Sequence, residues 1–363
     1  MAQFPLSTVA ILRQALACVA GEQWKRARSC LTPSFTPSAL RSAEPQLRAH
    51  ARRLAALAGG SAAAVSPRQL LAYCTDCVAS ALLGLQTRTL EDADGSSPFL
   101  EAVQRAHDAK TEPGRRFVFE YLGRAAFDAL GLGQLPDKIA NFFRSVAAVS
   151  IDHRNSNPVS SHDFVHLLTK RMKLEGADDK AVLHEVAFVN SQSFSSLQFR
   201  VRPPPSCQLA LERPATSCST ASWSWPRSHS CSSDCALTLL LLKIQLRCLC
   251  WKPLLMTLRL HPSEPVLSRE CRQACSLGGE RLQPGDRVLV PVWSLSRDCG
   301  PHGFQPDTGV EAPQLVFGGG PRKCVGYRLG LLAVKTAVVE LLSHYELSTK
   351  DGKTLHTRRV DNL

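Results

Sequence analysis

Apolar residues at helical spacing recur from residue 22 to about residue 173 and predict a series of amphipathic helices. One helical pattern stops at Gly59-Gly60, a pair that favours a helix end. Its apolar positions are Leu40, Leu47, Leu54 and Leu57. The stretches SPRQLLAYCTDCVASALLG and DKIANFFRSVAAVS show the same periodicity. This part of the chain is therefore predicted to be helical.

The pattern changes between Ser195 and Trp251, where neither a helical nor a strand period is sustained. Ser, Cys, Pro and Trp dominate, and Glu212 and Asp234 are the acidic residues of the stretch. A loop of this length is uncommon inside a compact domain. We interpret residues 195–251 as an irregular insert, or as a segment altered by mistranslation or splicing.

Regular patterning returns at LLMTLRLHPSEP, which predicts a short helix that ends at Pro262. Residues 284–286 predict a turn, and the alternation from Arg287 to Val292 predicts a strand. The stretch CVGYRLGLLAVKTAVVELLSHYEL then predicts a long helix with one buried face. The members of that face are Leu329, Leu332, Ala333, Thr336, Val339 and Leu342.

The composition is that of an ordinary globular protein, with 363 residues, 44% hydrophobic and 20% charged. The length would allow one domain or two. A net charge of +12 favours anionic partners such as acidic lipids or an acidic protein. Aromatic residues make up only 6% of the chain, and the Lys and Arg residues are scattered. We therefore expect no nucleic-acid binding.

The chain has 14 cysteines, and Cys74 and Cys77 have CxxC spacing. A zinc site would need two further ligands at matching spacing, so we expect this pair to pack inside a helix. No secretory signal is evident, and the thiols are expected to be reduced. The apolar runs near the N-terminus and at 235–250 are short and interrupted by polar residues, so no membrane anchor is expected.

The stretch FGGGPRKCVG, residues 317–326, lies directly before the long C-terminal helix. A phosphate loop would need Ser or Thr after its lysine, whereas Cys324 follows Lys323. A glycine-rich turn with a buried cysteine is the other simple interpretation. The fixed positions fit the pattern F-x-x-G-x-R-x-C-x-G, which resembles the haem loop of the cytochromes P450. These positions are Phe317, Gly320, Arg322, Cys324 and Gly326.

The resemblance implies haem b, an iron protoporphyrin, with Cys324 as its axial thiolate ligand and the metal ligand of the site. A thiolate is an electron-rich ligand, and the start of a helix favours its negative charge. Gly320 and Gly326 would let the backbone approach the macrocycle. Phe317 would shield the sulfur from water, and Arg322 would pair with a haem propionate.

A second motif lies far upstream, where EQWKRARSCLTPSFTPSAL resembles the family's W-x-x-x-R helix. Trp24 and Arg28 are one helical turn apart, so they face the same way. The resemblance implies that both contact a haem propionate. Further stretches match in the same order: SHDFVHLLTKRMK, TLRLHP and VLVPVWSLSRD.

The resemblance covers about three quarters of the chain and implies a mainly α fold with small β-sheets, that is, an incomplete α+β fold of the cytochrome P450 type. We expect residues 1–363 to form a single domain that lacks the amino-terminal anchor. Within the family, the amino-acid sequence of the final helix most resembles those of thromboxane synthase and of the microsomal drug and steroid monooxygenases.

The chain departs from the family pattern at three places. The family's E-x-x-R motif retains Arg259, but Met256 occupies the position of its Glu, and Thr308 stands near the expected position of a second Arg. After LHEVAFVNSQSF no acid–alcohol pair follows. Losing one partner of a buried ion pair costs about 3 to 5 kcal/mol.

The resemblance implies a haem-thiolate oxidoreductase that acts on a small apolar substrate, such as a fatty acid, prostanoid, steroid or xenobiotic. Its electrons would come from NADPH-cytochrome reductase, or it would rearrange an endoperoxide without them. It also implies the endoplasmic reticulum membrane as location, and the basic charge allows peripheral contact with an anionic membrane. The alternative is a non-catalytic product with an incomplete haem pocket.

Overall fold

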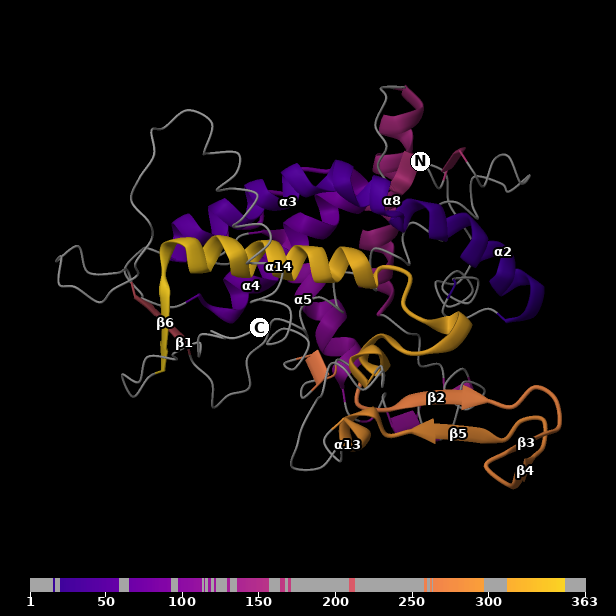
Figure 1. The fold of residues 1–363 in the computed structure, drawn as a ribbon. Coiled ribbons are helices and arrows are strands. Elements are labelled where there is room, and N and C mark those ends of the chain that lie inside the picture. The colour runs from indigo at the N-terminus through magenta and orange to yellow at the C-terminus, as the bar shows by residue number, and fades with distance from the viewer. Residues whose placement is uncertain are drawn as a thin grey trace.

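The structure is a computed structural model of the chain that describes residues 16, 20–58, 65–92, 97–112, 114, 117–118, 121, 129–130, 136–156, 164–166, 169–170, 209–212, 258–259, 262, 264–296 and 312–349. Within these residues the chain is mainly helical, with three two-stranded antiparallel sheets (Figure 1). The helices are α2 (Gly21–Leu31), α3 (Pro37–Ala58), α4 (Pro67–Val78), α5 (Pro98–Thr111), α8 (Asp137–Ser156), α13 (Val292–Leu295) and α14 (Tyr327–His344). The strands are β1 (Leu209–Glu212), β2 (Leu267–Glu270), β3 (Cys275–Leu277), β4 (Glu280–Leu282), β5 (Arg287–Val290) and β6 (Glu346–Thr349). This architecture confirms the predicted α+β class.

The boundaries of α4 follow from local chemistry. At its start, the Ser66 hydroxyl accepts a hydrogen bond from the Gln69 N–H, and the Gln69 side chain accepts one from the Ser66 N–H. This reciprocal pair satisfies two backbone donors that a helix start leaves without partners. The helix continues into a π-helical turn, η2 (Ala79–Leu83), and ends at Gly84, whose φ of 63° is the left-handed conformation that glycine favours.

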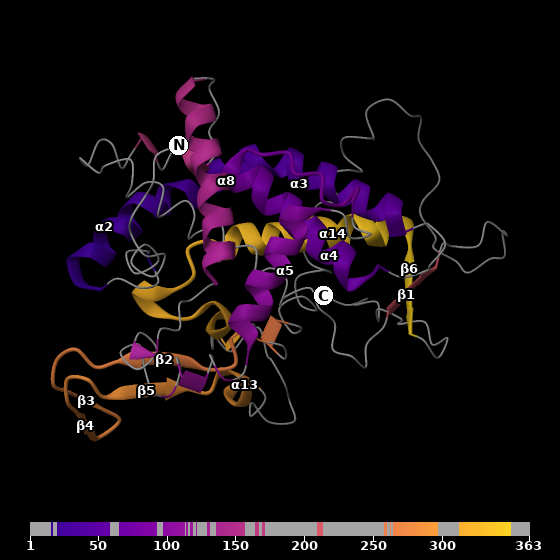
Figure 2. The ribbon, with the colours of Figure 1, turned by 180° about the vertical axis from the view of Figure 1, so that it is seen from behind.

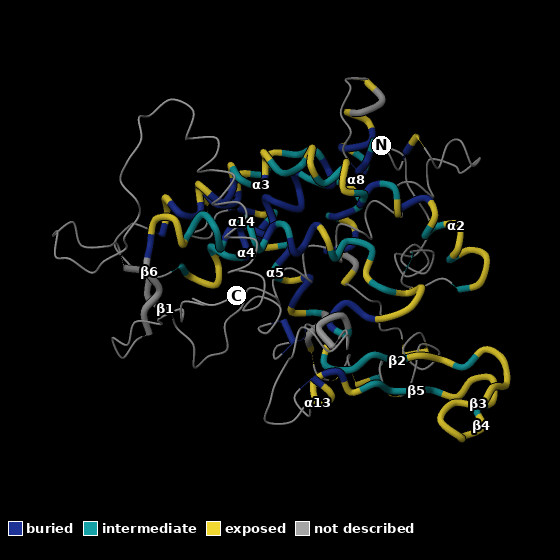
Figure 3. Tube along the Cα trace, viewed as in Figure 1, coloured by how far each residue is buried: buried dark blue, intermediate teal, exposed yellow. Residues whose placement is uncertain are grey.

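The core lies between α3, α4 and α14, although α14 is far from the other two helices in sequence. Figure 1 shows α14 running alongside α3, and Figure 3 shows buried positions along these helices. Two buried tyrosines connect the segments: the Tyr73 hydroxyl donates to the Ala333 carbonyl, and the Tyr345 hydroxyl donates to the Ala55 carbonyl, each at 2.7 Å. The two ends of the described chain therefore share one core.

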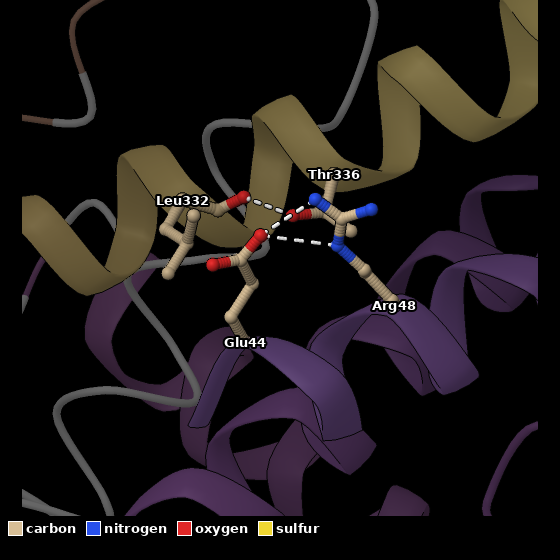
Figure 4. A network of polar contacts seen from close by, with 4 residues as sticks. All are labelled: Glu44, Arg48, Leu332 and Thr336. Carbon is tan, nitrogen blue, oxygen red and sulfur yellow. Dashed lines mark hydrogen bonds and ion pairs between the residues drawn. The ribbon is translucent and has the colours of Figure 1, made fainter. Parts of the chain in front are cut away.

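A polar group covers the edge of the contact between α3 and α14. The Arg48 guanidinium donates to the Glu44 carboxylate from Nε at 3.0 Å and from Nη2 at 2.6 Å. Figure 4 shows this pair next to Thr336 of α14, whose hydroxyl donates to the Leu332 carbonyl. An exposed pair at this helical spacing contributes only about 0.3 to 0.5 kcal/mol, so apolar burial holds the two helices together.

Helices α5 and α8 run steeply across the direction of α3 and α14, as Figure 2 shows from behind. Phe99 of α5 meets Phe142 of α8 edge to face, with ring centroids 5.4 Å apart. Phe143, next to Phe142, is fully buried. These aromatic contacts fix α5 and α8 to the core.

The small sheets lie apart from the helical core. β2 pairs with β5, from Leu267 opposite Val290 to Glu270 opposite Arg287, and β3 pairs with β4 beyond them. Figure 3 shows that the β3–β4 end of this hairpin is largely exposed. The predicted strand from Arg287 is confirmed, but it ends at Val290 because Pro291 has no N–H to continue the pairing.

The third sheet pairs β1 with β6, and β1 comes from the stretch that the sequence indicates to be irregular. The structure describes residues 209–212 of that stretch, and they form a strand. The other positions of 195–251 lie outside the described residues, so the irregular insert stays a prediction.

Two predicted core positions are wrong. Leu57 is 40% exposed and Leu342 is 39% exposed, since each lies close to the end of its helix. Conversely, Leu331 and Ala337 are buried outside the predicted face of α14. Leu331 packs with Leu258 on the side of α14 away from the main core, so α14 is covered on two sides.

The CxxC pair behaves as predicted, because Cys74 and Cys77 are both 1% exposed inside α4. Burial raises the pKa of the Cys74 thiol to about 12. The described residues contain no cluster of three potential metal ligands from His, Cys, Asp and Glu. No helix in the described part of the chain is both long and apolar enough to span a bilayer.

Candidate functional site

The loop before α14 is folded by its own backbone. A short 3₁₀ turn, η4 (Ala312–Phe317), leads to Gly318 with φ of 73°, and a second, η5 (Gly320–Arg322), follows. The Cys324 N–H donates to the Phe317 carbonyl at 2.8 Å, which closes the loop. Cys324 then lies two residues before Gly326, the residue that caps α14.

Cys324 is exposed and forms no disulfide. It lies beside the N-terminus of an 18-residue helix. The first N–H groups of a helix have no partners within it, and together with the helix dipole they favour a negative charge nearby. The structure therefore places Cys324 beside the N–H groups at the start of α14.

The Phe317 ring is 6% exposed and packs in a small apolar cluster with Leu258, Val316 and Leu331. Its centroid lies 5.7 Å from that of the Tyr327 ring. The ring thus anchors the loop to the core. Because Cys324 is exposed, the structure does not show the predicted shielding of the sulfur by Phe317.

The upstream motif and the cysteine loop lie in contact. Arg28 of α2 donates from Nη1 to the Lys323 carbonyl at 2.7 Å, across 295 positions of sequence. The Arg322 guanidinium lies over the Trp24 ring, with Cζ 4.7 Å from the centroid. Arg322 also donates from Nη1 to the Leu16 carbonyl at 3.5 Å. The structure therefore brings Trp24, Arg28 and Arg322 together beside Cys324.

Gly320 and Gly326 of the motif differ in what a side chain at each position would meet. Gly320 has φ of 65°, a conformation that other residues adopt at a cost of about 1 to 2 kcal/mol. A Cβ added at Gly320 would meet no atom within 4 Å. A Cβ at Gly326 would lie 3.4 Å from Cε1 of Phe35. The outer face of the loop at Gly320 is thus open to a ligand.

These residues fit the haem that the resemblance implies. Haem would bring an iron that binds a thiolate and propionates that carry negative charge. The site offers an exposed sulfur at a helix start, two guanidinium groups and an indole ring around an open loop. Charged donors of this kind form strong hydrogen bonds to carboxylates.

A second feature of the family pattern is present only in part. Arg259 is 4% exposed and donates from Nε to the Ser296 carbonyl at 2.7 Å, but its buried Nη1 has no hydrogen-bond partner among the described residues. The Ser296 hydroxyl is also buried without one. Met256 and Thr308, where the sequence departs from the family, lie outside the described residues, as does the stretch LHEVAFVNSQSF.

The sequence did not indicate two residues whose carbonyls bind arginines of the site. Lys323 supplies the carbonyl that Arg28 binds, and its Nζ lies 4.5 Å from the Tyr327 ring centroid. Leu16 supplies a carbonyl to Arg322. Backbone carbonyls have no residue-specific signal, so the identity of the Arg28 acceptor could not be found in the sequence.

Comparison with known proteins agrees with this site. The family model described as cytochrome P450 matches residues 257–360, which include the whole cysteine loop. Cytochrome P450 3A56 of Fundulus heteroclitus is 26% identical over 380 residues, covering 93% of this chain and 71% of that protein. Cytochrome P450 3A12 of Canis lupus familiaris is 24% identical over 374 residues, covering 94% and 71%.

Lithocholate 6-beta-hydroxylase of Mesocricetus auratus is 23% identical over 385 residues, covering 96% of this chain and 73% of that protein. The cofactor implied by these similarities is haem ligated by a cysteine thiolate, and the chemistry is that of a monooxygenase. The matching family model, the relatives aligned along nearly the whole chain, and the contact between the two motifs lead to one conclusion. This chain is similar to the cytochrome P450 family along nearly its whole length.

Proposed function

We propose that Cys324 is the axial ligand of the haem iron and that Arg28 and Arg322 bind the haem propionates. Trp24 supports Arg322 through the contact between its ring and the guanidinium. Phe317, Gly320 and Gly326 shape the loop that carries the sulfur. On this proposal, residues 1–363 form a single domain built around one cofactor.

The observation that carries this proposal is the meeting of α2 with the cysteine loop. Arg28 and Lys323 are 295 positions apart, yet their side chain and carbonyl are 2.7 Å apart. Arg28 is half-buried, and its hydrogen bond holds α2 against the loop. A shared site for a dianionic cofactor explains why both guanidinium groups lie beside one exposed cysteine.

Each residue contributes by binding or orienting. The start of α14 carries the loop that presents the Cys324 sulfur. Arg28 holds the loop at Lys323 while its remaining N–H groups can face a carboxylate. When bound, haem supplies the oxygen activation and insertion for which the protein's residues provide only position, charge and shelter from water.

The substrate that we propose is a small apolar molecule, such as a fatty acid, prostanoid, steroid or xenobiotic. A sterol-like substrate is supported by the similarity to a protein named lithocholate 6-beta-hydroxylase. The net charge of +12 supports docking of an acidic electron donor of the NADPH-cytochrome reductase type. It equally supports peripheral contact with the anionic face of the endoplasmic reticulum membrane. Endoperoxide isomerisation of the thromboxane synthase type is the alternative chemistry.

The test is to express the chain with a haem supply and to measure haem per protein together with the carbon monoxide spectrum of the reduced form. Full-length protein should show the Soret band of a thiolate-ligated haem. Cys324→Ala should lose that band, while the matched control Cys275→Ser, which removes another exposed thiol, should retain it. A thiolate band that survives Cys324→Ala refutes the ligand assignment.

Arg259 favours the alternative of a non-catalytic chain with an incomplete pocket. A buried guanidinium nitrogen without a partner costs about 1 to 3 kcal/mol, more where the charge is fully desolvated. On this alternative the folded chain binds far less than one haem per protein, and no variant of the site changes that. Stoichiometric haem and substrate turnover would eliminate it.

A further inference from the structure

Two cysteines meet in the hairpin that contains β2, β3, β4 and β5. Cys271 directly follows β2, and Cys275 is the first residue of β3. Their sulfur atoms are 3.8 Å apart. The two thiols therefore form a pair, unlike Cys324, which has no second cysteine in its loop.

Sheet pairing holds both residues in place. The Cys271 N–H donates to the Asp286 carbonyl, and the Cys271 carbonyl accepts from the Gly285 N–H, each at 2.8 Å. Cys275 pairs with Leu282 across β3 and β4. The two backbones are thus fixed on either side of a three-residue link, and their side chains come together without a change in fold.

The pair is accessible to solutes. Cys275 is exposed and Cys271 is half-buried, whereas Cys74 and Cys77 are enclosed in the core. Reactive thiols are those that are reached by solvent and can ionise. Desolvation and the hydrogen bond with Cys275 raise the pKa of Cys271. Cys275 is accordingly the thiol that meets an oxidant first.

We propose that Cys271 and Cys275 form a reversible two-electron redox site that closes to a disulfide with a small disulfide oxidant such as oxidised glutathione. The Cys275 thiolate attacks one sulfur of the oxidant, breaks its S–S bond and releases one glutathione thiol. The Cys271 thiolate then attacks the Cys275 sulfur of the mixed disulfide and releases the second thiol. The protein loses two electrons and two protons, and the oxidant is reduced to two thiols.

The geometry requires only a small movement. The sulfurs must approach from 3.8 Å to a bonded distance of about 2.05 Å, which side-chain rotation can supply. The bond would join the end of β2 to the start of β3 and so fix the corner of the hairpin. Arg269 of β2 reaches the cysteine loop, since its Nη2 lies 3.9 Å from the position of a Cβ built on Gly318. The redox site therefore lies on the element next to the cofactor loop.

The test uses peptide mapping, because the chain has 14 cysteines and a total thiol count would not locate the bond. Fully reduced full-length protein is treated with oxidised glutathione, its remaining thiols are alkylated, and it is digested with trypsin. Cleavage after Arg269, Arg272 and Arg281 places the two cysteines in separate peptides, 270–272 and 273–281. We expect these peptides to be joined by a disulfide that dithiothreitol releases.

Single cysteine variants test which thiol attacks oxidised glutathione first. In Cys271→Ser the mixed disulfide on Cys275 cannot be resolved, so glutathione should remain on residues 273–281 at about tenfold or more the level of the unaltered protein. Cys275→Ser should leave Cys271 mostly unmodified. The enclosed pair Cys74 and Cys77 is the internal control and should stay reduced until the protein unfolds.

Two outcomes would overturn the proposal. One is the absence of the linked peptides at an oxidised glutathione concentration that glutathionylates Cys275 in Cys271→Ser. The other is stable glutathione on Cys271 and on Cys275 separately in the unaltered protein, because a pair that can close displaces it. Neither outcome depends on haem binding or activity, so this test is independent of the proposed function.

Discussion

Replacing Arg28 with alanine is the sharpest single test of the contact between α2 and the cysteine loop. Arg28 donates to the Lys323 carbonyl at 2.7 Å, one residue before the proposed iron ligand. Arg26 lies on the same helix and is exposed, so Arg26→Ala is a matched control for the loss of one positive charge. We expect Arg28→Ala, but not Arg26→Ala, to weaken haem binding.

The expected size follows from two contacts. A hydrogen bond from a charged donor contributes about 1.5 to 3 kcal/mol, and the lower value applies here because Arg28 is only half-buried. If the loop must be held in this position to bind haem, the loss weakens binding about tenfold. A propionate contact of similar strength would raise the total to about 100-fold.

The assay is a haem titration of the apoprotein followed by absorbance, with urea unfolding of each variant to separate binding from stability. Arg28→Lys keeps the positive charge but loses the planar guanidinium group with its paired N–H donors. It should therefore recover only part of the haem affinity. Haem affinities of Arg28→Ala and Arg26→Ala that agree within about twofold would refute the role of Arg28.

The remaining predictions concern stability. Asp76→Ala should lower the free energy of unfolding by about 3 to 5 kcal/mol, measured by urea denaturation, because the buried carboxylate accepts hydrogen bonds from two backbone N–H groups and two threonine hydroxyls. A loss below about 1 kcal/mol would contradict this. Burial lowers the pKa of His50, partly opposed by the charge of Asp76, so the unfolded chain takes up a proton more readily. Stability should therefore be full above the ordinary histidine pKa of about 6.5 and decline as the pH falls below it, and His50→Gln should flatten that decline in unfolding curves measured across pH. Met256→Glu restores the carboxylate of the family's E-x-x-R motif, three positions before Arg259 in the sequence, and should raise the free energy of unfolding by about 1 to 3 kcal/mol. A destabilised variant would show that Arg259 does not need this partner.

Local patterns predicted the elements well. The stop of α3 next to Gly59-Gly60, the helical packing of the CxxC pair and the strand from Arg287 all follow from short-range spacing, and the structure contains each of them. The cysteine loop could be found for the same reason, since its fixed residues lie within ten positions. Short-range chemistry is what a sequence displays directly.

Long-range packing could not be predicted in this way. Periodicity marked Leu342 as buried and left out Leu331, because it cannot show that α14 is covered on two sides. The contact of Arg28 with the Lys323 carbonyl likewise depends on where distant segments come to lie. The family pattern alone placed Trp24 and Arg28 near the loop.

The two tyrosine bridges have a consequence for how the protein is made. Tyr73 and Tyr345 join the first helices to the last, so the ribosome must complete roughly 260 intervening residues before α3 and α4 can cover their apolar faces. Contacts this distant in sequence slow folding. During synthesis they leave apolar surface exposed to other chains. Premature termination ahead of Tyr327 would release the N-terminal helices without their partner, a product that chaperones and proteases should remove.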